Sequence, residues 1–167
     1  MPYCRQLSIT LPKTLAMAMI AAALALQIDA AHADAASAFS SMAGSWSGSG
    51  QMRLDGGRTE NLRCRASYTD RKGGLGIALR CASASSKVNL RASLTGSGSR
   101  VSGNWEEREF NAGGAASGSA SGNTISLSIS GGLDGTMNVT TNGARQQVSI
   151  TTQNVALKGI SIGLSRE

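Results

Sequence analysis

Residues 62–81 read LRCRASYTDRKGGLGIALRC, and they carry the clearest structural signal in the chain. On both sides of the glycine pair, apolar residues and cysteines alternate with polar residues, as is typical of half-buried β-strands. If Cys64 lies opposite Cys81, then Ala66 faces Leu79, Tyr68 faces Ile77, and Asp70 faces Leu75. Residues 71–74 then close the turn. The stretch therefore predicts a β-hairpin joined by a Cys64–Cys81 disulfide.

A disulfide indicates an oxidising compartment, and the start of the chain agrees with export. Arg5 and Lys13 precede an apolar run, which ends near Ala31 and Ala33, spaced as an A-x-A cleavage site. This order is typical of a secretory signal peptide. The apolar run from residue 15 to 26 is shorter than the about 20 residues that span a bilayer. We expect a signal peptide over residues 1–33, a periplasmic or secreted mature protein, and no transmembrane span in that mature chain.

Removal of residues 1–33 changes which chemistry the chain can perform. The sequence has 167 residues, a formal net charge of +6, one histidine and three cysteines. His32 and Cys4 leave with the signal peptide, as do Arg5, Lys13 and Asp29, so the net charge becomes +5. A chain without histidine lacks serine- or cysteine-protease machinery and the most common metal ligand. We therefore expect no enzyme activity, no cofactor and no metal.

Alternation continues through the rest of the chain. In GSWSGSGQMRL, residues 44–54, apolar residues and glycines occupy the even positions and polar residues the odd ones. Similar short alternating segments recur up to the C-terminus, separated by turn residues. A change of parity at Lys158-Gly159 predicts a β-bulge, and residues 110–114 are expected to form a turn or loop.

Eight to ten consecutive strands with short connections predict an all-β domain over residues 44–167. We expect a small antiparallel up-and-down β-barrel with one disulfide, because closure removes exposed strand edges. A β-sandwich or an open sheet is the alternative. Residues 34–43 are expected to form a lead-in segment, either a short helix that plugs the barrel with Phe39 and Met42 or an extended arm.

The start of the first strand resembles a known motif. Gly44-Ser45-Trp46 is similar to the G-x-W that opens lipocalins and has a counterpart in avidins, together the calycin-like barrels. In lipocalins the tryptophan closes one end of the barrel and a late arginine packs across it. The resemblance implies these barrel-closing roles for Trp46 and Arg166. The chain departs from lipocalins in lacking a T-D-Y motif before a middle strand. Periplasmic inhibitors of bacterial metalloproteases have a similar small barrel with one disulfide.

Two stretches could be mistaken for catalytic or phosphate-binding motifs. Residues 105–109, WEERE, hold the main acidic concentration, and paired carboxylates perform acid–base chemistry in glycosidases. Alternation would place Glu107 and Glu109 on one strand face and Glu106 on the other, so a polar strand end with a salt-bridged arginine is favoured. The glycine-rich segments are not followed by a helix that could hold a phosphate, and they are read as turns.

Basic residues recur at outward positions on the first four expected strands. Adjacent strands could gather them into one positive surface, although charge on a barrel exterior also serves solubility. The residues are Arg53, Arg63, Arg65, Arg80, Lys87 and Arg91.

The expected function follows from export, the barrel and this charge. We expect a non-catalytic protein of the bacterial envelope with a binding or structural role. Its partner would be an anionic envelope component or an acidic protein, rather than nucleic acid, since the mature chain has few aromatic residues on which bases could stack. The alternatives are a periplasmic protease-inhibitor-like protein, acting through a loop or the N-terminal arm, and a small-ligand carrier.

Overall fold

Alternating segments become ten antiparallel strands in the computed structural model, which describes residues 33–167. The expected signal peptide and its cleavage site lie almost wholly outside the described residues. The chain begins with one helix, α1 (Ala33–Met42), and a 3-10 turn (Asp55–Gly57) follows the first strand. The strands are β1 (Gly44–Leu54), β2 (Thr59–Arg71), β3 (Gly74–Ala82), β4 (Lys87–Ser97), β5 (Arg100–Glu107), β6 (Ala112–Ser121), β7 (Thr124–Gly131), β8 (Asp134–Asn142), β9 (Arg145–Gln153) and β10 (Leu157–Arg166).

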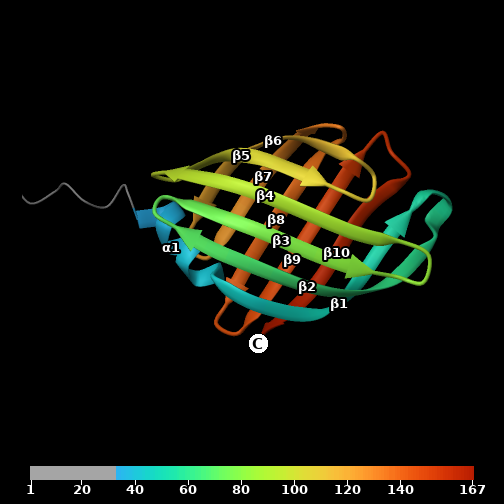
Figure 1. Ribbon diagram of the computed structural model, residues 1–167, viewed down its shortest axis with the longest axis horizontal. Helices are drawn as coiled ribbons and strands as arrows, with labels where there is room; N and C mark the ends of the chain where they lie inside the picture. Colours follow the sequence, from blue (N-terminus) through green and yellow to red (C-terminus); the bar gives the residue numbers. More distant parts are fainter. Residues whose placement is uncertain (1–32) are drawn as a thin grey trace, which may run out of the picture. The chain divides into compact units, whose positions relative to one another are not determined.

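These strands close into a barrel (Figure 1). Each strand pairs with the next one in sequence, and β10 pairs with β1. The fold is therefore the expected up-and-down antiparallel barrel rather than a sandwich or an open sheet. Leu54 pairs with Leu157 and Arg53 with Gly159, which leaves Lys158 as an extra residue. This register shift confirms the predicted bulge in the last strand.

The β2–β3 hairpin has the register that the sequence predicts. Cys64 pairs with Cys81, and their sulfur atoms are bonded, with Cα atoms 4.1 Å apart. The turn is shorter than expected, because Arg71 and Gly74 still pair and only two residues connect the strands. Gly73 has a φ of 73°, a left-handed conformation that glycine adopts at no steric cost and that permits so tight a turn.

The helix α1 covers one end of the barrel, and the β3–β4 and β5–β6 connections lie at the other end (Figure 1). Phe39 and Met42 of α1 are fully buried. A Cβ at Gly96 would lie only 2.6 Å from the Cβ of Ala35, so this glycine lets the helix sit close to β4. The lead-in is thus a helical plug rather than an extended arm.

Inward side chains of all ten strands form one apolar cluster with those of the helix. Trp105 illustrates its packing: the indole of this β5 residue donates a hydrogen bond to the carbonyl of Ser130 on β7, 3.3 Å away. Gly114 lies between them on β6, paired with Trp105. The expected turn is present at residues 110–111, but the expectation is wrong for residues 112–114, because β6 begins at Ala112. Among residues 33–167, no helix is both long enough and apolar enough to cross a membrane.

Candidate anion-binding groove

The outer face of β1–β4 gathers four of the six predicted basic residues. Arg65 pairs directly with Arg80, and Ala82 pairs with both Arg63 and Lys87. The four basic side chains are exposed and line one groove of about 800 Å³. We call this depression the cationic groove; its basic lining is Arg63, Arg65, Arg80 and Lys87.

The groove owes its room to short side chains beside the long ones. Ser47 pairs with Arg65, and Ser49 pairs with Arg63; with Gly48, they are the small residues that the neighbouring strand β1 contributes to the lining. Ala82 separates Arg63 from Lys87 in the same cross-strand row. An anionic group can therefore approach the four cations without displacing a bulky residue.

Positive charge exceeds negative charge within the groove. Like charges directly opposite one another in a sheet are destabilising, as for Arg65 and Arg80. None of the four cations forms an ion pair with a carboxylate in the part of the chain that the structure describes. Glu109 lines the groove without pairing to them. The groove thus has a local charge of about +3, from four cations and one carboxylate, and it favours an external anion.

Asn89 has an unsatisfied polar atom beside the same groove. This residue lines the groove and pairs with Arg80. Its side-chain oxygen is buried and has no hydrogen-bond partner among residues 33–167. Because this atom is buried, it offers no exposed acceptor to the groove.

The remaining two predicted basic residues lie elsewhere. Arg53 lines a separate depression near the 3-10 turn, beside Lys158. Arg91 lines another with Glu106, which is its partner on β5. The six residues therefore do not share one groove, because the register places Arg91 next to a carboxylate and Arg53 near the end of β1.

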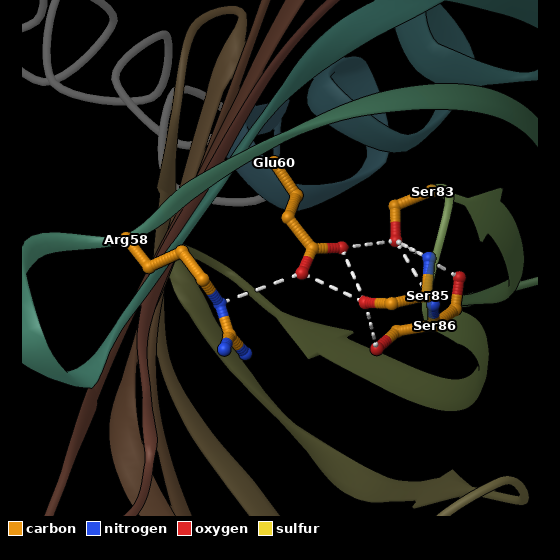
Figure 2. Close-up of polar contacts among 5 residues, drawn as sticks. All are labelled: Arg58, Glu60, Ser83, Ser85 and Ser86. Atoms are coloured by element: carbon orange, nitrogen blue, oxygen red, sulfur yellow. Dashed lines mark hydrogen bonds and ion pairs between the residues drawn. The ribbon is translucent and has the colours of Figure 1, made fainter.

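A separate polar cluster forms around Glu60, which does not line the groove (Figure 2). The Glu60 carboxylate accepts hydrogen bonds from Ser83 at 2.6 Å and Ser85 at 2.7 Å, and Arg58 lies 3.6 Å away. The Ser83 bond, then the Ser85 bond and the Arg58 charge, lower the pKa of Glu60 below its ordinary value. Glu60 is therefore committed to the β3–β4 loop. It is also a poor general base, since lowering the pKa weakens its affinity for a proton.

The acidic stretch 105–109 contains the expected salt-bridged arginine, and it also contains a buried carboxylate that was not expected. Glu106 pairs with Arg108 at 2.9 Å, in an exposed ion pair. Glu107 faces inward, only 7% exposed, and its carboxylate accepts hydrogen bonds from the backbone N–H groups of Asn89 and Phe110. Sequence reasoning missed this buried carboxylate, although its parity with Trp105 indicates the inward face. The geometry is that of a turn anchor rather than of a catalytic pair.

Trp46 and Arg166 contact each other beside the C-terminal end of α1. Trp46 is fully buried, and its indole donates a hydrogen bond to the carbonyl of Met42, 2.8 Å away. Arg166 donates hydrogen bonds to the carbonyls of Ser41 and Ala43. The two side chains therefore satisfy carbonyl groups at the end of the helix that would otherwise lack partners.

A second polar group inside the barrel was not predicted. The Tyr68 hydroxyl donates a 2.7 Å hydrogen bond to Gln146, whose amide donates a 3.0 Å bond to Thr141. All three residues are buried, and burial raises the pKa of the Tyr68 hydroxyl above its ordinary value. Each named donor finds an acceptor within this group, so it is a satisfied structural network.

Within residues 33–167, no three His, Cys, Asp or Glu side chains are placed to hold a metal ion.

Comparisons with known proteins identify the fold. No protein-family model matches the chain, and no curated protein matches it. Among solved structures, Rv2717c from M. tuberculosis is similar with a TM-score of 0.62 at 16% identity, over 78% of this chain and 95% of that one. The S-type phycobiliprotein lyase CPES from Guillardia theta has a TM-score of 0.56 at 11% identity, over 80% and 93%.

At these identities the likeness concerns the fold alone. Together with the closed ten-stranded barrel, it shows that the chain has a calycin-like β-barrel fold.

Proposed function

We propose that this protein is an exported, non-catalytic binding protein of the bacterial envelope, and that its cationic groove binds an anionic group of an envelope component. One observation carries the proposal: four cations line one groove without an ion pair to any carboxylate of the described chain. Two of them, Arg65 and Arg80, directly oppose each other on adjacent strands. This like-charge pair destabilises the free protein, and binding of an anion would explain why it is present.

Two features support export. Residues 1–33 have the charged, apolar and small-residue order of a signal peptide. The bond between Cys64 and Cys81 is of a kind that persists in oxidising compartments and is rare in the cytosol.

The polar clusters favour binding over catalysis. Ser83 and Ser85 touch Glu60, but a carboxylate with a lowered pKa does not activate a hydroxyl. The sequence after residue 33 contains no histidine that could take this part. Tyr68 is engaged with Gln146 inside the barrel.

Two alternatives receive less support. A carrier with its ligand inside the barrel would need room that the apolar side chains of the ten strands and α1 occupy. An inhibitor acting through an extended N-terminal arm would need residues 34–43 free, whereas Phe39 and Met42 are buried.

The test compares two double variants of equal charge. R65Q/R80Q removes two cations from the groove, and R100Q/R145Q removes two exposed cations that do not line it. Binding of sodium polyphosphate would be measured by isothermal titration calorimetry at low and high salt. We expect the affinity of R65Q/R80Q to fall at least about tenfold, since charge-assisted hydrogen bonds are lost. R100Q/R145Q should bind as the unchanged protein does.

Thermal unfolding of the same variants separates binding from folding. R65Q/R80Q should unfold at the same or a higher temperature, because a like-charge pair has been removed. A polyaspartate peptide, titrated in parallel, represents an acidic protein partner. Equal loss of polyphosphate affinity in both double variants would overturn the groove as the binding site. Tighter binding to polyaspartate than to polyphosphate would replace the envelope component by an acidic protein.

A further inference from the structure

Phe110 is the large hydrophobic side chain that the described chain leaves exposed, at 65%. It lies in the connection between β5 and β6, at the end of the barrel remote from α1 (Figure 1). A single exposed apolar residue on a surface needs no explanation by itself. Phe110 differs from such a residue because hydrogen bonds fix the backbone of its turn.

A buried carboxylate fixes the position of Phe110. The Glu107 side chain accepts the Phe110 N–H at 2.8 Å and also the N–H of Asn89 on β4. The N–H of Arg108 donates to the carbonyl of Asn89 at 3.2 Å. Asn111 completes the turn in a left-handed conformation, with a φ of 50°. The turn is thereby bound to β4, and the aromatic ring points outward from a defined position.

This position adjoins the cationic groove. Asn89, to which the turn is bound, lines the groove, and so does Glu109, the neighbour of Phe110. Of the two other acids near the turn, Glu106 forms an ion pair with Arg108, and Glu107 is buried. The exposed Phe110 therefore directly follows Glu109 in sequence and adjoins a groove that four cations line.

We propose that Phe110 and the cationic groove together form a docking face for an anionic phospholipid bilayer. The inference rests on the proposed function and names its partner. Peripheral membrane proteins combine aromatic residues that enter the interface with basic residues that attract anionic lipids. Here the aromatic group is Phe110, and the basic group consists of Arg63, Arg65, Arg80 and Lys87.

Vesicle sedimentation tests the docking face. The protein would be produced from the full chain and recovered after export, with its N-terminus established by mass spectrometry so that a retained leader is detected. Vesicles of phosphatidylglycerol and phosphatidylcholine would be compared with vesicles of phosphatidylcholine alone. We expect binding to the mixed vesicles, with R65Q/R80Q roughly 30-fold weaker and R100Q/R145Q changed far less.

Variants of the turn separate the aromatic contribution from the charge. Phe110→Ser should weaken vesicle binding roughly tenfold and leave polyphosphate binding unchanged. Phe110→Leu keeps an apolar side chain and should retain most of the vesicle affinity. Glu109→Gln removes the one carboxylate of the groove and should strengthen binding to mixed vesicles about fivefold. Circular dichroism of each variant verifies the fold.

The outcomes distinguish the two proposals. If Phe110→Ser binds vesicles as tightly as the unchanged protein, or if vesicles of phosphatidylcholine alone bind equally well, the docking face is wrong. The proposed function then still stands if R65Q/R80Q loses polyphosphate binding. If R65Q/R80Q binds polyphosphate normally, the proposed function fails, and a loss of vesicle binding in Phe110→Ser alone would leave a purely apolar membrane contact instead.

Discussion

The guanidinium of Arg166, on the last strand, lies 4.2 Å from the centroid of the Trp46 indole, on the first strand. The two residues are also directly paired where β10 closes the barrel against β1. Both donate hydrogen bonds to carbonyl groups at the C-terminal end of α1. One contact therefore joins the first strand, the last strand and the helix that covers them.

Trp46→Ala should destabilise the protein by roughly 3–5 kcal/mol, since it removes a fully buried aromatic side chain. Arg166→Ala should cost about 1–2 kcal/mol, because it removes a cation–π interaction and hydrogen bonds to helix carbonyls. The cost is smaller than for Trp46→Ala, since the Arg166 side chain is exposed. Urea unfolding measures both free energies. Equal effects of the two variants, or less than 1 kcal/mol for Trp46→Ala, would show that the indole does not close this end of the barrel.

The Cys64–Cys81 bond should contribute about 3 kcal/mol, because it restricts an unfolded loop with a sequence separation of 17. Comparing the unreduced protein with the protein kept in reductant, by urea unfolding, gives this value. Thiol counting on denatured, unreduced protein after leader removal should find no free thiol. Two free thiols would contradict the bond directly.

Tyr68→Phe should cost about 1–3 kcal/mol, because it leaves the buried acceptor of Gln146 without its donor. The variant should also change the response to alkali. The unfolded tyrosine loses its proton near pH 10, whereas burial raises the pKa of the folded one above its ordinary value. The native protein therefore loses stability as the pH rises beyond about 10. The difference in unfolding midpoint between the two proteins should shrink over that range, and a constant difference would refute the assignment.

Glu60→Gln should destabilise the protein at neutral pH and have less effect in acid. The pKa of Glu60 is lowered in the folded protein, so its stabilising contribution is present above the ordinary glutamate pKa of about 4.3. That contribution is lost as the pH falls through the lowered value. Urea midpoints of both proteins, followed across this range, should converge in acid. Glu106→Gln is the control, because its carboxylate is exposed and contacts only Arg108 among the ion pairs described.

Alternation alone predicted most of the fold. The face of each residue from Leu62 to Cys81 followed from period two, and the shared register of the apolar positions and the cysteines placed the hairpin. Glycine was harder to interpret. Gly113 and Gly114 suggested a loop, yet they pair with Glu106 and Trp105 within the barrel. A residue that favours turns by conformation also serves in strands where no side chain fits.

The candidate site was predictable only in part. Parity assigned the four groove cations to the outer face, but which of the six basic residues share a groove depends on register across four strands. A charged residue such as Glu107 is expected to lie in solvent. Here the backbone N–H groups of Asn89 and Phe110 stabilise its carboxylate in a buried position. Gln146 could have been assigned inward from its parity with Val148, although no local pattern reveals its contact with Tyr68, 78 positions away in sequence.

The contacts of Arg166 with Trp46 and α1 also indicate which part of the fold is completed last. Arg166 is the last residue of β10, so it follows every other element that it joins in the sequence. The β2–β3 hairpin is closed by residues near one another in sequence, but the barrel is not sealed and the helix is not held until β10 pairs with β1. A chain in which β10 has not yet paired leaves the edges of β1 and β9 exposed, and such edges favour pairing with another chain.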